Sequence, residues 1–276
     1  MNPDRIYRQY REDALAKQVT ASKYTTFVAM PFGDQFSYHS RDILRDVIQK
    51  AATLANEKKS PARPFAPPMR IDELAGTARV VTEEIIVKIL ESHLFIADLT
   101  FENAGVLLET GIALGLKPNP QIILITQGKL SDLHFDIRNN NVISYKNDDS
   151  VDAIAEALIA AAKAFEADTK RHITAITATL SPDAIFCLRH YGAIQRQDPI
   201  NSLHADIACN IFPNDGRARE RFDTGTRELL RTRLIWTDWP KTRGTIEFFG
   251  MHATDLGWAV IGEKWPELKK QSATGT

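Results

Sequence analysis

Cysteine and long apolar runs are both scarce in this sequence. The only cysteines, Cys187 and Cys209, lack the paired spacing of a zinc site, so we interpret both as reduced packing residues and expect no structural metal. Nothing approaches the roughly 18 consecutive apolar residues that a membrane-spanning helix needs. No apolar signal segment follows the polar start. These absences favour a cytoplasmic protein without membrane contact.

An excess of charge of one sign is missing as well. The formal net charge is −1, with 25% charged and 43% hydrophobic residues, which is typical of a soluble globular protein. Such a balance gives no global attraction to nucleic acid, so any nucleic-acid surface must be local. The chain of 276 residues exceeds the roughly 100–200 of one domain, and we therefore look for two.

Short apolar runs alternate with helical periodicity between residues 24 and 168. The predicted strands are 27–30, 94–97, 121–126 and 142–145, and the predicted helices are 43–54, 80–90, 105–116 and an alanine-rich one from 151. This alternation needs crossovers and predicts an α/β domain with a parallel sheet. The proline-rich stretch 62–70 is typical of an edge strand or an extended loop. Residues 1–23 are expected to form a helical arm or a partly ordered tail.

The second segment, 173–266, has a different pattern. Its predicted elements are a helix capped by Ser181 that ends at Gly192, an arginine-bearing helix over 222–234, strands at 235–236 and 246–249 around the turn-prone 240–244, and a last helix capped by Thr254. Helices, a hairpin and a closing helix predict a winged helix-turn-helix domain. Residues 267–276 are expected to be a disordered tail.

Glu109 is the most informative residue of the first domain, because the helix around it is otherwise almost entirely apolar. An unpaired buried carboxylate is costly, so this glutamate needs a partner or a task. One interpretation is an ion pair with an arginine such as Arg70. The other is a site, which Gly105 and Gly111 favour because they let a ligand or the backbone approach closely.

Further candidate groups follow the ends of predicted strands, where ligands bind in open parallel sheets. They are the Met30-Pro31-Phe32-Gly33 loop, Asp98-Leu99-Thr100 and the segment after Thr126. Asp98 is equally suited to capping the loop after its strand. For Arg70-Ile71-Asp72 the alternative to ligand contact is a surface ion pair, and for Asp136 it is a place in a turn.

Taken in order, these landmarks resemble the nucleoside 2-deoxyribosyltransferase-like and TIR-like superfamily of small Rossmann-type domains. The resemblance extends over about half the chain, and its matching segments are 27–32, 70–73, 96–100, Asn103 with 109–113, and 135–137. The resemblance implies a Rossmann-like (flavodoxin-like) fold over 24–168 and a catalytic Glu109 that acts at the anomeric carbon of a sugar. It makes substrate-binding candidates of Met30, Pro31, Phe32, Arg70, Asp72, Asp98, Asn103 and Asp136, with Phe32 lining the base pocket.

Two departures from that pattern affect the expected chemistry. The acid that stands six residues before the glutamate in the classical transferases is replaced by Asn103, which cannot exchange a proton near neutral pH. The residues around the glutamate also differ, reading Gly105-Val106-Leu107-Leu108-Glu109-Thr110-Gly111. These two departures count against base exchange and leave hydrolysis open. No cofactor is implied, but NAD is a candidate substrate, because its cationic nicotinamide needs no acid in order to leave.

Three hypotheses follow from the sequence. The first is an N-glycosidase or transferase acting on a nucleoside, nucleotide, NAD or nucleic-acid base. The second is a nucleotide-sensing regulator with a DNA-binding winged helix, and the third is a scaffold that assembles with a partner. The pairing with a winged helix resembles bacterial antiphage effectors, including those that accompany retrons. This resemblance adds a second copy of the chain or another component of a defence complex as candidate partners.

The local surface for nucleic acid is expected between residues 217 and 243. That stretch has eight basic residues against four acidic ones. The candidate contacts are Arg227, Arg231, Arg233, Lys241 and Arg243. Binding would be weak, largely independent of base sequence and steeply sensitive to salt, because phosphate contacts dominate such affinity.

Overall fold

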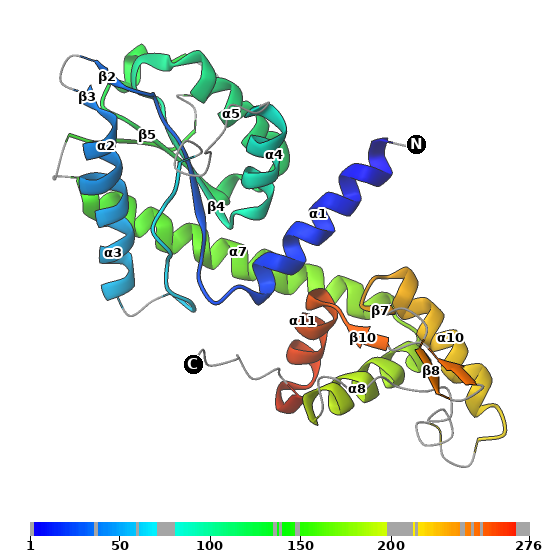
Figure 1. The fold of residues 1–276 in the computed structure, drawn as a ribbon. Coiled ribbons are helices and arrows are strands. Elements are labelled where there is room, and N and C mark those ends of the chain that lie inside the picture. Colours follow the sequence, from blue (N-terminus) through cyan, green and yellow to red (C-terminus); the bar gives the residue numbers. More distant parts are fainter. Residues whose placement is uncertain are drawn as a thin grey trace. The chain divides into compact units, whose positions relative to one another are not determined.

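Two units, each with its own hydrophobic core, make up the chain (Figure 1). The computed structural model describes residues 3–35, 38–58, 61–70, 81–134, 137, 140–146, 150–197, 212, 215–237, 241–243, 246–248 and 251–268. The first unit comprises Met1–Ala14 and Ala21–Asp168, and the second comprises Leu15–Thr20 and Thr169–Thr276. No helix in these ranges is long and apolar enough to cross a membrane.

A four-stranded, all-parallel sheet forms the centre of the first unit. Its strands are β1 (Thr26–Ala29), β4 (Leu94–Asp98), β5 (Ile122–Thr126) and β6 (Val142–Ser144), in the order β1-β4-β5-β6. Three of the four are almost entirely buried, which explains their continuous apolar sequences. The predicted parallel sheet is therefore confirmed. All four strands end at the same edge, which we call the carboxyl edge.

The proline-rich stretch lies alongside β1 as an extended segment. The amide of Tyr24 donates to the carbonyl of Pro64 at 2.8 Å, and the amide of Val28 donates to the carbonyl of Met69 at 2.9 Å. These bonds belong to two isolated parallel bridges, which pair Tyr24 with Phe65 and Phe27 with Met69. The prolines leave too few donors for a full ladder, as expected for an edge segment.

Helices cover both faces of this sheet (Figure 1). One face is covered by α2 (Ser40–Asp42), a π-helical stretch (Ile43–Gln49), α3 (Lys50–Glu57) and α7 (Val151–Thr179). The other is covered by α4 (Val81–Glu91) and α5 (Ala104–Leu116). A small ribbon of β2 (Asp34–Gln35) and β3 (Tyr38–His39) follows β1, and 3-10 turns occupy Thr100–Glu102, Asn119–Gln121 and Leu130–Asp132.

The first residues form a helix, α1 (Pro3–Thr20), in agreement with the predicted helical arm. The helix α7 is longer than expected, because no glycine or proline interrupts residues 151–179. The division between the two units, after Asp168, falls inside it.

The second unit combines helices with two short antiparallel strand pairs. Its elements are α8 (Pro182–Gln197), α10 (Ala218–Arg231), β7 (Ile235–Thr237), β8 (Lys241–Arg243), β9 (Ile246–Phe248), β10 (Met251–Ala253), α11 (Asp255–Lys264) and a 3-10 turn (Pro266–Leu268). The predicted caps are confirmed: the hydroxyl of Ser181 accepts from the amide of Ala184, and that of Thr254 accepts from the amide of Gly257.

The predicted hairpin is wrong in its pairing. We expected 235–236 and 246–249 to flank a turn at 240–244. Instead, β7 pairs with β10, and Lys241–Arg243 is itself a strand that pairs with β9. Pro240 and Gly244 suggested a turn, but the three residues between them suffice for a short strand.

The predicted stop at Gly192 is also wrong, since α8 continues to Gln197. Gly192 permits close packing against a neighbouring helix and does not end α8. A Cβ atom at residue 192 would lie 2.9 Å from a side-chain carbon of Ile261 in α11. Gly225 has the same function in α10, because a Cβ there would lie 2.7 Å from the carbonyl oxygen of Asp183.

Candidate functional site

Asp98 ends β4 at the carboxyl edge and is completely buried. Its Oδ2 accepts hydrogen bonds from the hydroxyls of Tyr38 at 2.8 Å and Tyr145 at 2.5 Å. Its Oδ1 accepts from the hydroxyl of Thr100 at 2.6 Å and from the amide of the same residue at 3.1 Å. Four donors thus replace the water that the carboxylate loses on burial.

This arrangement corresponds to the capping alternative for Asp98, since the aspartate holds the loop that follows its own strand. Burial raises the pKa of the Asp98 carboxyl, although its hydrogen bonds act in the opposite direction. Burial and the neighbouring aspartate also raise the pKa values of Tyr38 and Tyr145, so both phenols stay protonated donors. The contact between Asp98 and a sugar or base that we expected from the sequence has no exposed surface to support it.

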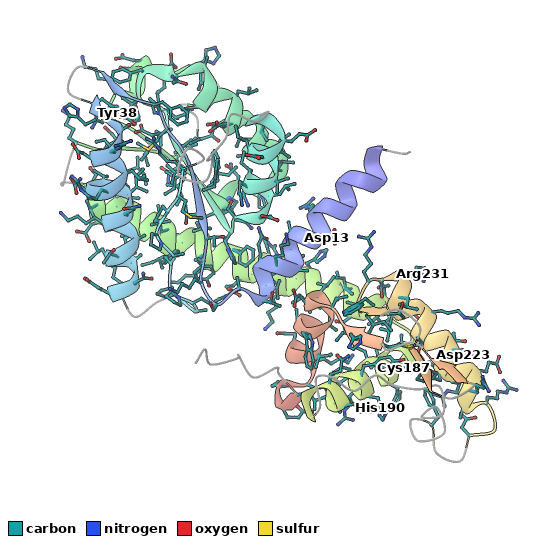
Figure 2. The ribbon with its side chains drawn as sticks, in the orientation of Figure 1. Asp13, Tyr38, Cys187, His190, Asp223 and Arg231 are labelled. Carbon is teal, nitrogen blue, oxygen red and sulfur yellow. The ribbon has the colours of Figure 1, made fainter. Side chains whose placement is uncertain are left out.

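Tyr38 and Tyr145 were not predicted from the sequence. Tyr38 is supplied by the β2–β3 ribbon and is labelled in Figure 2, whereas Tyr145 follows β6 directly. Thr100 extends the network, because its hydroxyl accepts from the amide of Gln127 at 2.9 Å. The loops after β1, β4, β5 and β6 are therefore tied together at the carboxyl edge around Asp98.

Glu109 lies in α5, within two turns of the point where the chain leaves that edge. The buried stripe of α5 consists of Val106, Thr110 and Ala113, and Glu109 is partly buried on its flank. Burial alone raises the pKa of its carboxyl to about 7. Among the described residues none forms a hydrogen bond or ion pair with it, so the pairing with Arg70 that we considered is absent.

Arg70 instead lies against Phe32, the exposed residue of the loop after β1. The guanidinium carbon of Arg70 is 5.1 Å from the centre of the Phe32 ring, which corresponds to a cation–π contact. The arginine is only 5% exposed, and its charge acts on the ionisation of Tyr38. Phe32 is 56% exposed. The structure therefore brings together Phe32, Arg70 and the network around Asp98.

The remaining candidates of the first domain divide into three groups. Met30 and Pro31 are buried, and Met30 belongs to the hydrophobic core, so they shape the loop rather than face solvent. Asn103 caps α5, with its side-chain oxygen accepting from the amides of Gly105 and Val106 at 3.0 and 3.3 Å. Asp72 and Asp136 lie outside the described residues.

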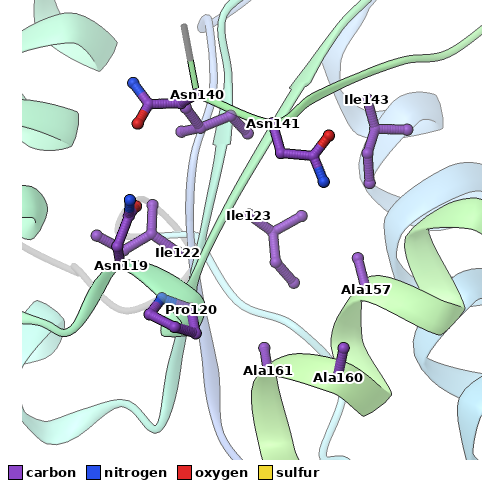
Figure 3. Close-up of a pocket in the computed structure, with 11 residues that line it drawn as sticks. Asn119, Pro120, Ile122, Ile123, Asn140, Asn141, Ile143, Ala157, Ala160 and Ala161 are labelled. Atoms are coloured by element: carbon purple, nitrogen blue, oxygen red, sulfur yellow. The ribbon is translucent and has the colours of Figure 1, made fainter. Parts of the chain in front are cut away.

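A pocket of about 340 Å³ lies at the opposite edge of the sheet, where β5 and β6 begin (Figure 3). Three asparagines and several small or branched apolar side chains line it, and none of the predicted site residues that the structure describes does so. The lining residues are Asn119, Pro120, Ile122, Ile123, Leu124, Asn140, Asn141, Ile143, Ala157, Ala160 and Ala161. Its position separates it from the carboxyl edge by the length of the strands.

The candidate arginines of the second unit lie along and after α10, where Asp223 and Arg231 are labelled in Figure 2. Arg227 and Arg231 are exposed. Arg233 has a left-handed φ of 57° and ends the helix, because its amide and that of Leu234 bond back to the carbonyls of Leu230 and Leu229. The side chains of Lys241 and Arg243 lie outside the described part of the chain.

An open hollow of about 550 Å³ follows the first three turns of α10. It is lined by Gly216, Arg217, Arg219, Glu220, Asp223, Thr224 and Arg227.

In the described ranges, no cluster of three or more histidine, cysteine, aspartate or glutamate residues is arranged to hold a metal ion. Comparison of this chain with protein-family models, with curated proteins and with solved structures gave no match.

Proposed function

We propose that the first unit is a Rossmann-like (flavodoxin-like) domain that cleaves the N-glycosidic bond of a nucleoside, a nucleotide, NAD or a base in a nucleic acid. The proposal places the substrate at the carboxyl edge, with its anomeric carbon against Glu109. It is supported by the resemblance of the sequence landmarks to the nucleoside 2-deoxyribosyltransferase-like and TIR-like superfamily, and by a sheet whose strands are all parallel.

The observation that carries this proposal is the condition of Glu109. Its carboxyl is partly buried on the flank of α5, has no partner among the described residues and has a pKa of about 7 because of burial. A carboxylate that only stabilised the fold would be paired, as Asp98 is. Perturbed carboxyl groups without a structural partner are typical of acid, base and nucleophile positions.

The chemistry needs one carboxylate. As the bond between the anomeric carbon and the base nitrogen breaks, the bonding electrons leave with the base and positive charge develops on the sugar ring. Ionised Glu109 either bonds to the anomeric carbon or offsets this charge, and water then delivers its hydroxyl to the same carbon. Hydrolysis thus regenerates the carboxylate and releases the base and the sugar.

The leaving base must be protonated or already cationic. Asn103 caps α5 through its side-chain oxygen and cannot donate a proton of the required acidity. A cationic leaving group, such as the nicotinamide of NAD, removes the need for an acid. We therefore expect NAD or a related nicotinamide nucleotide to be cleaved faster than an uncharged nucleoside.

For the second unit we propose a winged helix-turn-helix fold that contacts nucleic acid through α10 and the strands after it. The exposed Arg227 and Arg231 and the open hollow along α10 support this assignment. If catalysis were absent, the same arrangement would suit the alternative function, a regulator that senses a nucleotide at the carboxyl edge. We further propose that the protein acts in antiphage defence, with a second copy or another component of a defence complex as its partner.

Product analysis tests the enzymatic proposal. The full-length protein is incubated with NAD, nucleoside monophosphates, nucleosides and single-stranded DNA, and the products are separated by chromatography. We expect free base or free nicotinamide together with the matching sugar product. No release of base from any of these compounds would contradict glycosidic cleavage and favour the sensor, whereas release of phosphate without base would indicate a different hydrolysis.

A further inference from the structure

Two neighbouring residues in the loop after β4 have left-handed backbone conformations. Phe101 has φ 66° and ψ 9°, and Glu102 has φ 47°. Glycine adopts this region without strain, and asparagine or aspartate adopts it more readily than an aromatic residue. A phenylalanine at φ 66° is therefore an outlier that the surrounding structure must hold in place.

The hydrogen bonds of the loop provide that support. The amide of Glu102 donates to the carbonyl of Leu99 at 3.0 Å, and its carboxylate accepts from the amide of His134 at 2.6 Å. On the other side, Thr100 is bonded to Asp98. Phe101 is thus fixed between two anchored residues, and its conformation does not depend on its own ring.

The ring of Phe101 gains little burial from this conformation. It is 51% exposed, and the ring contact it makes among the described residues is an edge-on approach to Tyr38, with centroids 5.5 Å apart at an interplanar angle of 70°. A turn alone would be satisfied by glycine at lower cost. Strained residues that are over-determined by their surroundings cluster at ligand sites, which suggests that the exposed ring is retained for a ligand.

A second exposed phenylalanine lies in the loop after β1. Phe32 is 56% exposed and carries Arg70 against its ring. The positive charge of Arg70 partly offsets the raised pKa of Tyr38, and the ring of Tyr38 contacts Phe101. The loops after β1 and β4 therefore each carry an exposed phenyl ring at the carboxyl edge, one against Arg70 and the other against Tyr38.

We propose that Phe101 is a substrate-binding residue that stacks on the planar base of the substrate, with Phe32 as the second aromatic contact. The inference rests on the proposed function and refines it. Phenyl rings offer no hydrogen bonds to the edge of a base, so recognition follows the flat heterocycle itself. Stacking of this kind tolerates purines, pyrimidines and nicotinamide alike.

The test uses the full-length protein with Glu109→Gln, which removes turnover, and measures the binding of AMP, UMP and nicotinamide mononucleotide by calorimetry. Phe101→Gly should weaken all three by about tenfold, as expected for the loss of one stacking contact. Phe101→Trp should restore or tighten binding. Leu114→Ala is the control, because it truncates an exposed apolar residue within α5, and it should leave the binding of all three nucleotides unchanged.

The thermal midpoint of the first unit separates a ligand contact from a purely structural role. If Phe101 contacts the ligand, Phe101→Gly should leave this midpoint unchanged or raised while binding falls, because glycine adopts φ 66° without strain. Unchanged binding in Phe101→Gly, or failure of all three nucleotides to bind, would overturn the inference. Base release by the protein with Glu109 intact is measured separately: if no base is released but binding depends on Phe101, the glycosidase proposal fails and the stacking site stands.

Discussion

Replacing Glu109 with glutamine should stabilise the first unit while it abolishes catalysis. In the folded protein the pKa of this carboxyl is raised from 4.5 to about 7 by burial. The unfolded chain therefore releases the proton more readily than the folded chain. Between pH 4.5 and about 7 the folded state binds more protons, so the stability contributed by this group is present at low pH and is lost as the pH rises.

The magnitude follows from the difference between the two pKa values. At 1.36 kcal/mol per pKa unit, ionised Glu109 costs the folded state about 3 kcal/mol above pH 7. Glutamine carries no charge but leaves a partly buried amide to be desolvated, so we expect a net gain of about 1–3 kcal/mol at pH 8. At pH 4.5 the gain should vanish, because the carboxyl is then protonated in the folded protein.

Circular dichroism of unfolding at pH 4.5, 6 and 8 measures this difference. The exposed Glu83→Gln is the matched control and should show no such pH dependence. All four tryptophans lie between residues 236 and 265, so tryptophan fluorescence reports the second unit and should be unaffected. If Glu109→Gln is neutral or destabilising at pH 8, Glu109 is a paired structural residue and the reasoning about its task fails.

Three further predictions concern pH dependence, the buried network and the arginines. The value of kcat/KM for base release should rise with pH and level off above an apparent pKa of about 7, since the carboxyl of Glu109 must be ionised; a falling profile would assign it the role of an acid. Tyr145→Phe removes a 2.5 Å donor to buried Asp98 and should destabilise the first unit by about 1–3 kcal/mol in the same dichroism assay; unchanged stability would contradict the network. Charge reversal of both Arg227 and Arg231 should weaken DNA binding measured by anisotropy and lower the slope of log K against log salt by up to about 2, whereas the exposed Lys163→Glu in the first unit should not.

The elements that local pattern specifies were predictable. Buried parallel strands such as β4 and β5 have continuous apolar sequences, and the caps Ser181 and Thr254 have the side chains that a helix start requires. Gly192 was misinterpreted because a glycine that admits a neighbouring side chain looks, in sequence, like a glycine that ends a helix. The strand pairing after Ile235 failed for a similar reason, since short strands depend on partners that the local sequence does not name.

The surroundings of the candidate site were harder to predict. The two tyrosine hydroxyls that bond to Asp98 come from residues 60 and 47 positions away, and no local pattern connects such distant tyrosines. Glu109 was identifiable because a lone carboxylate interrupts an apolar helix. Phe101 was not, because a left-handed phenylalanine has no sequence signal and its conformation depends on a bond between Glu102 and His134.

The central claim, that the carboxyl of Glu109 carries out glycosidic cleavage, is tested most directly by one ratio of rates. The release of nicotinamide from NAD, or of free base from the best substrate in the panel, is measured at pH 8 for the unaltered protein and for Glu109→Gln. We predict that the rate falls by at least about a thousandfold, as for the loss of a nucleophile, while the variant remains folded. A folded variant with unchanged turnover would show that another residue performs the reaction.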